Sequence, residues 1–388
     1  MIDFEKRLKL LKERRQGSRE RAIYDSVGVE SLAATKAINE GLDYRVQESF
    51  EKLNESNGIK YTIGAMAPVD ERSTEISIDE GNRVADSLIK SLNNRGESVT
   101  KRLQGSVALD IHIKGHSDVD MLIVVTNPVN VEYPKVESSL YSPATDPRSL
   151  INIAKDVRNK SEKILPINFP KVDVDCSHNK AIALNGGSLA RKVDIVPAIW
   201  FDSIKYQKSG KEHDRGIKIY HKEDHEFILN YPFTHIKYVN DRDSLYSGNL
   251  KCVVRLMKNM VADMPDYKKR VAKELSSYDL AAIGYHMNKS LELPIYMRLG
   301  LVEKTRSYLS LLLEVKEYRE SLDVPDGSRK IFSKEEKTAA LEILANEFED
   351  LANAIFKELK PFQSVYDPSV IINKQVASVS DNNYLNYL

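Results

Sequence analysis

The chain has 388 residues, of which 41% are hydrophobic and 29% charged, as in an ordinary folded protein. This length exceeds what one hydrophobic core usually spans, so it predicts two packed lobes or one domain with a large elaboration. Fifty-seven Lys and Arg residues balance 57 Asp and Glu residues. A uniformly basic coat for extended, non-specific duplex binding is therefore excluded, whereas a local basic patch remains compatible with the composition.

Cysteine usage and the first residues bear on location. Cys176 and Cys252 are the two cysteines, too few for a disulfide framework or a zinc knuckle, which favours a reducing, cytoplasmic setting. The opening residues are charged throughout, and no stretch approaches about 18 consecutive apolar residues. We expect neither a signal peptide nor a membrane span.

The first part of the chain has helical patterns. Phe4, Leu8 and Leu11 recur at helical spacing, and a looser helical pattern covers residues 31–53. A third helix is expected from about Asp79 to Leu92.

The pattern then changes to short runs rich in β-branched residues, which predict a sheet. The expected strands lie in VALDIHIKG (107–115), DVDMLIVV (118–125), VDVDC (172–176), KAIALN (180–185) and KVDIVPAIWF (192–201). Residues 127–146 contain three prolines and several serines, which predicts a long loop before a helix at about 150–164.

Beyond about Tyr238 the strand pattern ends. Segments 249–263, 278–289, 305–321 and 334–359 have helical periodicity and predict a helix bundle, followed by a flexible tail after Val376. We therefore predict an α+β protein with two lobes. The core lobe, with a mixed sheet and the N-terminal helices, would span residues 1–237, and the helical lobe residues 238–388.

The most informative segment contains Asp118 and Asp120. Two residues apart in a strand, their carboxylates point to one face while Val119 and Met121 point to the other. Carboxylates this close repel and raise one another's pKa unless a cation lies between them. Oxygen ligands without His or Cys favour Mg²⁺ or Mn²⁺, which commonly bridges to substrate phosphates.

A third carboxylate is expected from a neighbouring strand. Asp194 is the best candidate, because it is a lone acid within an apolar strand. Asp173 and Asp175 repeat the Asp-x-Asp spacing without a preceding Gly-Ser pair, which is more typical of an edge pair. They remain the alternative to Asp194.

Ser106, which follows Gly105, stands twelve residues before Asp118, one predicted strand upstream. Glycine permits close approach of the backbone, and a serine hydroxyl and N–H can hold a phosphate oxygen. Alone, a Gly-Ser pair indicates an ordinary turn. It gains meaning from its distance to the aspartates.

Together, Gly-Ser, Ser-Asp-x-Asp on the next strand and a distant Asp-x-hydrophobic-Pro resemble the signature of the DNA polymerase β-like nucleotidyltransferases. In the second lobe, LKCVVRLMKNM and SSYDLAAIGYHM resemble motifs of the cGAS/DncV-like nucleotidyltransferases (CD-NTases), the bacterial relatives of cyclic GMP-AMP synthase. The resemblance covers about residues 103–287. It implies a two-lobed polymerase β-like fold, with an opening helix as the spine between the lobes.

The resemblance also implies roles for individual residues. Asp118, Asp120 and Asp194 would be catalytic and would hold two Mg²⁺ (or Mn²⁺) ions. Lys258 and Ser277 would hold the triphosphate, and Tyr278 would stack on a base. The implied substrate-binding residues are Gln104, Gly105, Ser106, Ser117, Lys258, Ser277 and Tyr278.

The basic residues around Lys258 have a simpler reading as a solvated helix face. Lys251 and Arg255 lie on the same stripe of the predicted helix. For each of these two residues, two interpretations stay open: it contacts a phosphate, or it pairs with an acid across the lobe interface.

Such a protein would join ribonucleoside triphosphates into a cyclic di- or trinucleotide second messenger, releasing pyrophosphate. The product would activate a separate effector in CBASS-type antiphage defence, and some relatives have a regulatory partner protein. Cyclisation is implied by the resemblance alone, because the residues themselves indicate only nucleotidyl transfer. A transferase that modifies RNA ends, a small molecule or a protein is the alternative, and an inactive nucleotide-binding scaffold is a third reading. Neither a membrane nor a long nucleic-acid activator is expected; bases, linkage and ring size stay open.

Histidines are treated as less informative. His213, His221, His225 and His235 cluster in sequence, but without cysteines in a hydrophilic stretch they indicate surface histidines more than a zinc site. His116 precedes Ser117 and Asp118 without the context of a Ser-His-Asp hydrolase. We expect it in a loop near the donor phosphates.

Overall fold

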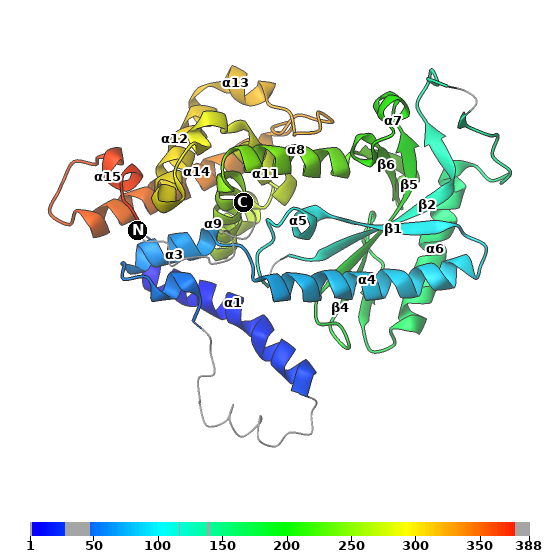
Figure 1. Cartoon of the computed structure of the whole chain (residues 1–388), viewed down its shortest axis with the longest axis horizontal. Helices are drawn as coiled ribbons and strands as arrows, with labels where there is room; N and C mark the ends of the chain where they lie inside the picture. The colour runs from blue at the N-terminus through cyan, green and yellow to red at the C-terminus, as the bar shows by residue number, and fades with distance from the viewer. Residues whose placement is uncertain (1, 28–46, 116, 138–139, 377–388) are drawn as a thin grey trace.

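The computed structural model describes residues 2–27, 47–115, 117–137 and 140–376. They form a sheet flanked by two helices on one side of the molecule and a group of packed helices on the other (Figure 1). This is the α+β, two-lobed arrangement that the sequence predicts.

The sheet is mixed. Five strands lie in the order β1 (Val99–Gln104), β2 (Val119–Val131), β5 (Val193–Asp202), β4 (Ile182–Asn185) and β3 (Asp173–Asp175). Strands β2 and β5 are parallel, and the other neighbours are antiparallel. The far end of β5 also pairs with β6 (Gly216–His221), which pairs with β7 (Glu226–Asn230). The parallel pair places the starts of β2 and β5 side by side.

Helices α4 (Glu71–Asn93) and α6 (Leu150–Asn168) cover one face of the sheet. That face is apolar because alternate residues of the central strands, such as Val119, Met121 and Ile123, point into it. The opposite face carries Leu122, Val124, Val196 and Trp200 in a smaller buried cluster. By the same alternation Asp120 and Asp194, at the strand starts, belong to this second face.

The helical lobe is built from amphipathic helices around one apolar core. In α14, for example, Leu341, Leu344, Phe348, Leu351 and Ile355 recur at helical spacing and are all fully buried. The helices from α8 onward are α8 (Pro232–Leu245), α9 (Asn249–Asp263), α10 (Asp266–Ala272), α11 (Ser277–His286), α12 (Leu301–Glu314), α13 (Lys316–Ser321), α14 (Glu335–Leu359) and α15 (Pro368–Ile372).

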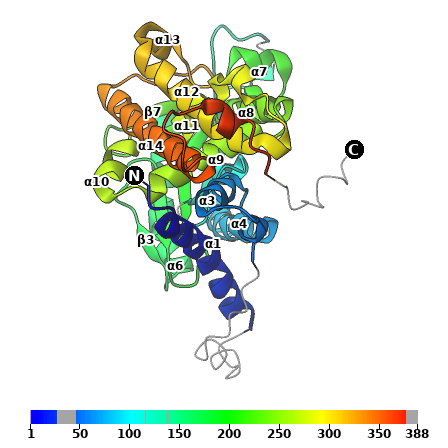
Figure 2. The same ribbon diagram turned by 90° about the vertical axis from the view of Figure 1, so that its left-hand side faces the viewer.

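The N-terminal helices α1 (Phe4–Val27) and α3 (Asn57–Met66) pack against this helical core (Figure 2). Phe4, Leu8, Leu11 and Tyr61 are buried in the same cluster as α9 and α14. This apolar packing associates α1 and α3 with the C-terminal helices rather than with the sheet. The boundary between the two lobes at residue 237 stays a prediction.

Most predicted elements are present, but several differ: α4 begins eight residues before the expected Asp79, the segment expected at 305–321 forms the two helices α12 and α13, and β6 and β7 were not predicted. Residues 107–115 do not form the expected strand: a short helix, α5 (Gly105–Ala108), and irregular backbone follow β1, which lies upstream at Val99–Gln104. The predicted loop starts later than residue 127, because β2 continues to Val131.

The predicted helix over 31–53 lies largely outside the described residues, and its end, Ser49–Lys52, is a 3₁₀ helix. The tail after Val376 lies outside them as well. Across the described ranges, no helix is long and apolar enough to cross a membrane.

Candidate active site

Strand register assembles a row of polar side chains on the second face of the sheet. Gln104 of β1 lies opposite Asp120 of β2, and Asp120 lies opposite Asp194 of β5. Residues directly opposite one another in a sheet project from the same face at about 4.5–5.5 Å between Cβ atoms. The register thus brings Asp120 and Asp194 together, although 74 residues separate them in sequence.

The two alternative aspartates lie farther along the same sheet. Asp175 of β3 is opposite Ala183 of β4, and Ala183 is opposite Asp194. Asp173 is the next same-face residue on β3, paired with Asn185. Asp194 is therefore the acid that lies directly beside Asp120.

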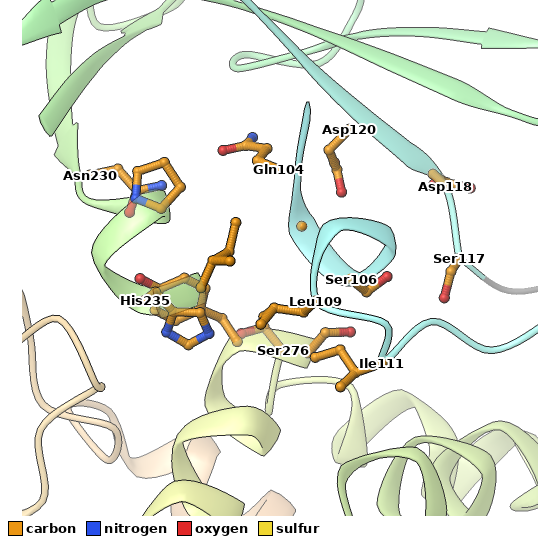
Figure 3. Close-up of a pocket in the computed structure, with 15 residues that line it drawn as sticks. Gln104, Ser106, Leu109, Ile111, Ser117, Asp118, Asp120, Asn230, His235 and Ser276 are labelled. Atoms are coloured by element: carbon orange, nitrogen blue, oxygen red, sulfur yellow. The ribbon is translucent and has the colours of Figure 1, made fainter. Parts of the chain in front are cut away.

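Gly105 is required where it stands. Its φ is +75°, and a Cβ atom there would lie 2.0 Å from Asp120 Oδ2. Any side chain would collide with the carboxylate, and the left-handed backbone would be strained in addition. The Gly-Ser turn after β1 thus packs directly against Asp120, with Ser106 in the first turn of α5 (Figure 3).

The clustered carboxylates disturb one another. Burial, together with Asp194 and Asp118, raises the pKa of Asp120 to about 7. Burial also raises the pKa of Asp194, and Asp118 adds to the effect while Lys192 opposes it. Oδ1 of Asp194 is buried without a hydrogen-bond partner. The positive charges of Lys192 and Lys258 offset only part of the repulsion and burial that raise the pKa of Asp120.

The aspartates do not form a complete metal cage by themselves. Asp118 lies one residue before β2, and its Oδ2 accepts a 2.7 Å hydrogen bond from Lys192 Nζ. Within the described part of the chain, no three His, Cys, Asp or Glu side chains are already grouped as metal ligands. The oxygen-only donor set, the raised pKa of Asp120 and the orphan oxygen of Asp194 nevertheless fit a hard divalent cation.

A pocket of about 350 Å³ opens beside these residues. Figure 3 shows Gln104 and Asp120 on one side of it, with His235 and Ser276 on the opposite side. The sheet lobe contributes one wall and helices α8 and α11 the other. Predicted site residues in its lining are Gln104, Gly105, Ser106, Ser117, Asp118, Asp120, Ser277 and Tyr278.

Asp194 and Lys258 do not line this pocket directly. Asp194 is the register neighbour of Asp120. Lys258, on α9, is 8% exposed, and its Nζ lies 3.4 Å from Ser117 Oγ. Burial lowers the pKa of Lys258 to about 8, against the opposing attraction of Asp120. The ammonium thus lies close behind the Ser-Asp-x-Asp segment.

The other basic residues of α9 pair with protein groups. Arg255 donates to the backbone oxygens of Met66 and Asp110 at 2.7 Å each, and its guanidinium lies 3.5 Å from the Asp110 carboxylate. Lys251 Nζ is 4.0 Å from Asp243. Arg255 therefore pairs with an acid, as one of the two interpretations of this residue predicts, while its place at a lobe interface stays a prediction.

The helical wall is formed by the start of α11. Ser276 caps this helix, and its hydroxyl and the Asp279 carboxylate bond each other's backbone N–H in a capping box. Ser277 and Tyr278 follow in the first turn. The Tyr278 ring stacks on His235 with 3.6 Å between centroids and 19° between planes, and its hydroxyl donates to Asp326 Oδ2.

His235 corrects the prediction of surface histidines. Its side chain is 2% exposed, it lines the pocket, and both ring nitrogens lack a hydrogen-bond partner. Burial lowers its pKa to about 4. Asn230, at the end of β7, is another lining residue that the sequence did not indicate. His116 lies outside the described residues.

Comparisons with known proteins agree with this geometry. The chain is 36% identical to a cyclic dinucleotide synthase CdnE from Yersinia aleksiciae over 366 residues, covering 92% of this chain and 93% of that protein. No model of a protein family matches the chain.

Two solved structures are similar over most of their length. A STING-associated CdnE c-di-GMP synthase from Capnocytophaga granulosa has 27% identity and a TM-score of 0.66, covering 91% of this chain and 98% of that one. A second such synthase, from Flavobacteriaceae sp., has 25% identity and a TM-score of 0.65, covering 88% and 97%.

The carboxylate row, the Gly-Ser turn and the helical wall are thus found in a chain that aligns with a CdnE synthase almost from end to end. The protein belongs to the bacterial cGAS/DncV-like nucleotidyltransferases, among the CdnE cyclic dinucleotide synthases.

Proposed function

We propose that this protein joins ribonucleoside triphosphates into a cyclic dinucleotide and releases pyrophosphate. The observation that carries the proposal is the pairing of Asp120 with Asp194 beside the Gly105 turn, at a pocket walled by α11. The resemblance to CdnE synthases supplies the cyclisation. A trinucleotide product remains within the expectation from the sequence.

Asp118, Asp120 and Asp194 are proposed as ligands for two Mg²⁺ or Mn²⁺ ions. When bound, such ions lower the pKa of the attacking ribose hydroxyl and neutralise charge on the α-phosphate and the leaving pyrophosphate. Asp194, whose Oδ1 has no hydrogen-bond partner, is also proposed to accept the proton of that hydroxyl. Lys192 would exchange its contact with Asp118 for a substrate phosphate.

The remaining residues bind and orient the nucleotides. Ser106 and Ser117 lie next to the carboxylates, and their hydroxyls are proposed to hold phosphate oxygens. Gln104, at the end of β1, contacts the same nucleotide. Lys258 and Ser277 hold the triphosphate from the helical side, and Tyr278, which lines the pocket, stacks on a base.

Guanosine triphosphate is the first candidate substrate, because the Capnocytophaga granulosa relative is a c-di-GMP synthase. We propose that the product activates a separate effector in antiphage defence. A regulatory partner protein and a cytoplasmic location stay expectations from the sequence.

The test incubates the purified protein with each of the four radiolabelled ribonucleoside triphosphates, singly and mixed, with Mg²⁺ or Mn²⁺. A phosphatase-resistant product is expected from wild type, and its mass gives bases and ring size. Asp120→Asn should reduce the rate at least about 10³-fold, since catalysis here is mainly electrostatic positioning.

Metal binding is checked without turnover. Mg²⁺ is expected to raise the melting temperature of wild type but not of the variant, because ligand binding to the folded state stabilises it. The matched control is Asp173→Asn, an exposed β3 carboxylate that lies farther along the sheet. Equal product from wild type and Asp120→Asn would refute the proposed site.

A further inference from the structure

A hairpin of the helical lobe contacts Tyr278, one of the residues that line the proposed nucleotide pocket. Residues 323–330 lie between α13 and α14, and Figure 1 shows this part of the chain extending towards α8. A β-bridge pairs Asp323 with Lys330, and Val324 N–H donates to Arg329 O at 2.9 Å. The hairpin is therefore a defined structure rather than an open loop.

Asp326, at the tip of this hairpin, is buried against the pocket wall. Its side chain is 0% exposed. One carboxylate oxygen accepts the 2.8 Å hydrogen bond of Ser328 N–H, and the other accepts the hydroxyl of Tyr278. A charged acceptor makes the stronger kind of hydrogen bond, particularly away from water. The tip of the hairpin thus holds the end of the tyrosine ring.

Other contacts fix the same ring and its helix. His235 stacks on one ring face. Arg329, also of the hairpin, forms a 2.7 Å ion pair with Asp279, the capping-box residue at the start of α11. The hairpin therefore contacts both the Tyr278 side chain and the turn of helix that carries it.

We infer that Asp326 is a positioning residue that sets the orientation of Tyr278 for nucleobase stacking. This inference rests on the proposed function, since it concerns the same nucleotide site. Asp326 does not line the pocket and acts through the Tyr278 hydroxyl. Without that bond, the ring turns about its side-chain bonds, and binding is weakened more than the chemical step.

The test measures binding of each α,β-methylene ribonucleoside triphosphate, with Mg²⁺, and separately kcat and KM for synthesis. Asp326→Ala should raise Kd and KM about tenfold while kcat changes less than about twofold. Asp326→Asn should stay within about threefold of wild type, because its amide still hydrogen-bonds both Ser328 and the phenol. Tyr278→Phe should reproduce Asp326→Ala.

The decisive comparison is the double variant. If Asp326 acts through the hydroxyl, Tyr278→Phe with Asp326→Ala should bind no more weakly than Tyr278→Phe alone. The matched control is Asp323→Ala in the same hairpin, whose carboxylate makes an exposed 3.0 Å ion pair with Lys330. It should leave Kd, KM and the melting temperature unchanged.

The outcomes separate this inference from the proposed function. Failure of wild type to bind any triphosphate would refute the function. Normal binding by wild type with equal Kd for Asp326→Ala, or full additivity in the double variant, would refute the positioning role alone. If Asp326→Ala unfolds, the Tyr278→Phe variant decides, because it leaves the hairpin intact. An unchanged Kd of Tyr278→Phe would overturn the inference.

Discussion

Some buried polar atoms at and beside the pocket have no hydrogen-bond partner. Asp194 Oδ1 and both nitrogens of His235 are buried without hydrogen-bond partners. Each such group costs stability, of the order of 1–3 kcal/mol. His235 lines the pocket, and Asp194 lies directly beside the lining residue Asp120, so both are close to the space that a charged, hydrogen-bonding ligand would occupy.

His235 makes the stability of the protein depend on pH. Burial lowers its pKa from 6.5 to about 4, and Arg329 adds to the effect while Asp326 and Asp279 oppose it. Above pH 6.5 both folded and unfolded states hold it neutral, so it contributes nothing. Between pH 6.5 and 4 the unfolded state binds the proton first, so stability falls as pH falls, by up to about 3 kcal/mol.

The measurement compares the unfolding free energy of wild type and His235→Phe, by denaturant titration, at pH 7.5 and pH 4.5. Wild type should lose about 2–3 kcal/mol more than the variant. His112, whose pKa burial also lowers to about 4, is common to both proteins and cancels. Parallel pH profiles would show that His235 is not held neutral in the folded state.

Among the elements, α4 comes unusually close to the start of β2. Gly81 lies in the middle of this helix, and a Cβ there would be 2.7 Å from Val119 Cγ1 and 3.1 Å from Met121 Cγ. Glycine costs about 1 kcal/mol in a helix interior. Close packing behind the residues flanking Asp120 explains why it is used there.

Gly81→Leu is therefore expected to destabilise the protein by about 3 kcal/mol through overpacking. Because the displaced residues flank Asp120, the rate of synthesis should fall with it. Melting temperature and product formation are measured beside Asp79→Leu, which places the same side chain on the exposed side of α4 and should cost less than about 0.5 kcal/mol. Equal stability of the two variants would contradict the close packing.

Local spacing determined which elements could be predicted. The Asp-x-Asp pair and the helices with regular apolar periodicity carry their signal within a few residues. The strand predicted at residues 107–115 was wrong because Leu109 and Ile111 are apolar for another reason. They fill the core shared with the helical lobe. Strand β1 has the polar sequence VTKRLQ, since it pairs only with β2 and is half-buried at the sheet edge.

The site residues that were missed depend on distant contacts. His235 was expected at the surface because a hydrophilic sequence surrounds it. Its burial comes from Tyr278 on another helix, and the role of Asp326 comes from a contact across 48 residues. No periodicity or spacing within one segment contains that information.

At the scale of the whole molecule, α9 contacts both the sheet lobe and the N-terminal helix α1. It carries Lys258 towards Ser117 of the sheet lobe, and Arg255 of the same helix holds the backbone at Met66 and Asp110. On its other side α9 is held by α1. Arg14 makes two hydrogen bonds to the Asp263 carboxylate, at 2.6 and 3.1 Å, at the end of α9.

This Arg14–Asp263 pair is buried, with side-chain exposures of 8% and 1%, and Asp263 also accepts the Tyr61 hydroxyl at 2.9 Å. Arg14→Ala should lower the unfolding free energy by about 3–5 kcal/mol, because it leaves a buried carboxylate without its cation. Adding Asp263→Asn should recover part of the loss, since the amide is neutral and still accepts from Tyr61.

The control is Lys9→Ala on the same helix, which removes an exposed 3.9 Å pair with Glu13 and should cost less than about 0.5 kcal/mol. Denaturant unfolding of wild type, Arg14→Ala, Asp263→Asn and the double variant gives the coupling energy of the pair. Additive losses in the Arg14→Ala, Asp263→Asn protein would mean that α1 is not attached to α9 through this pair.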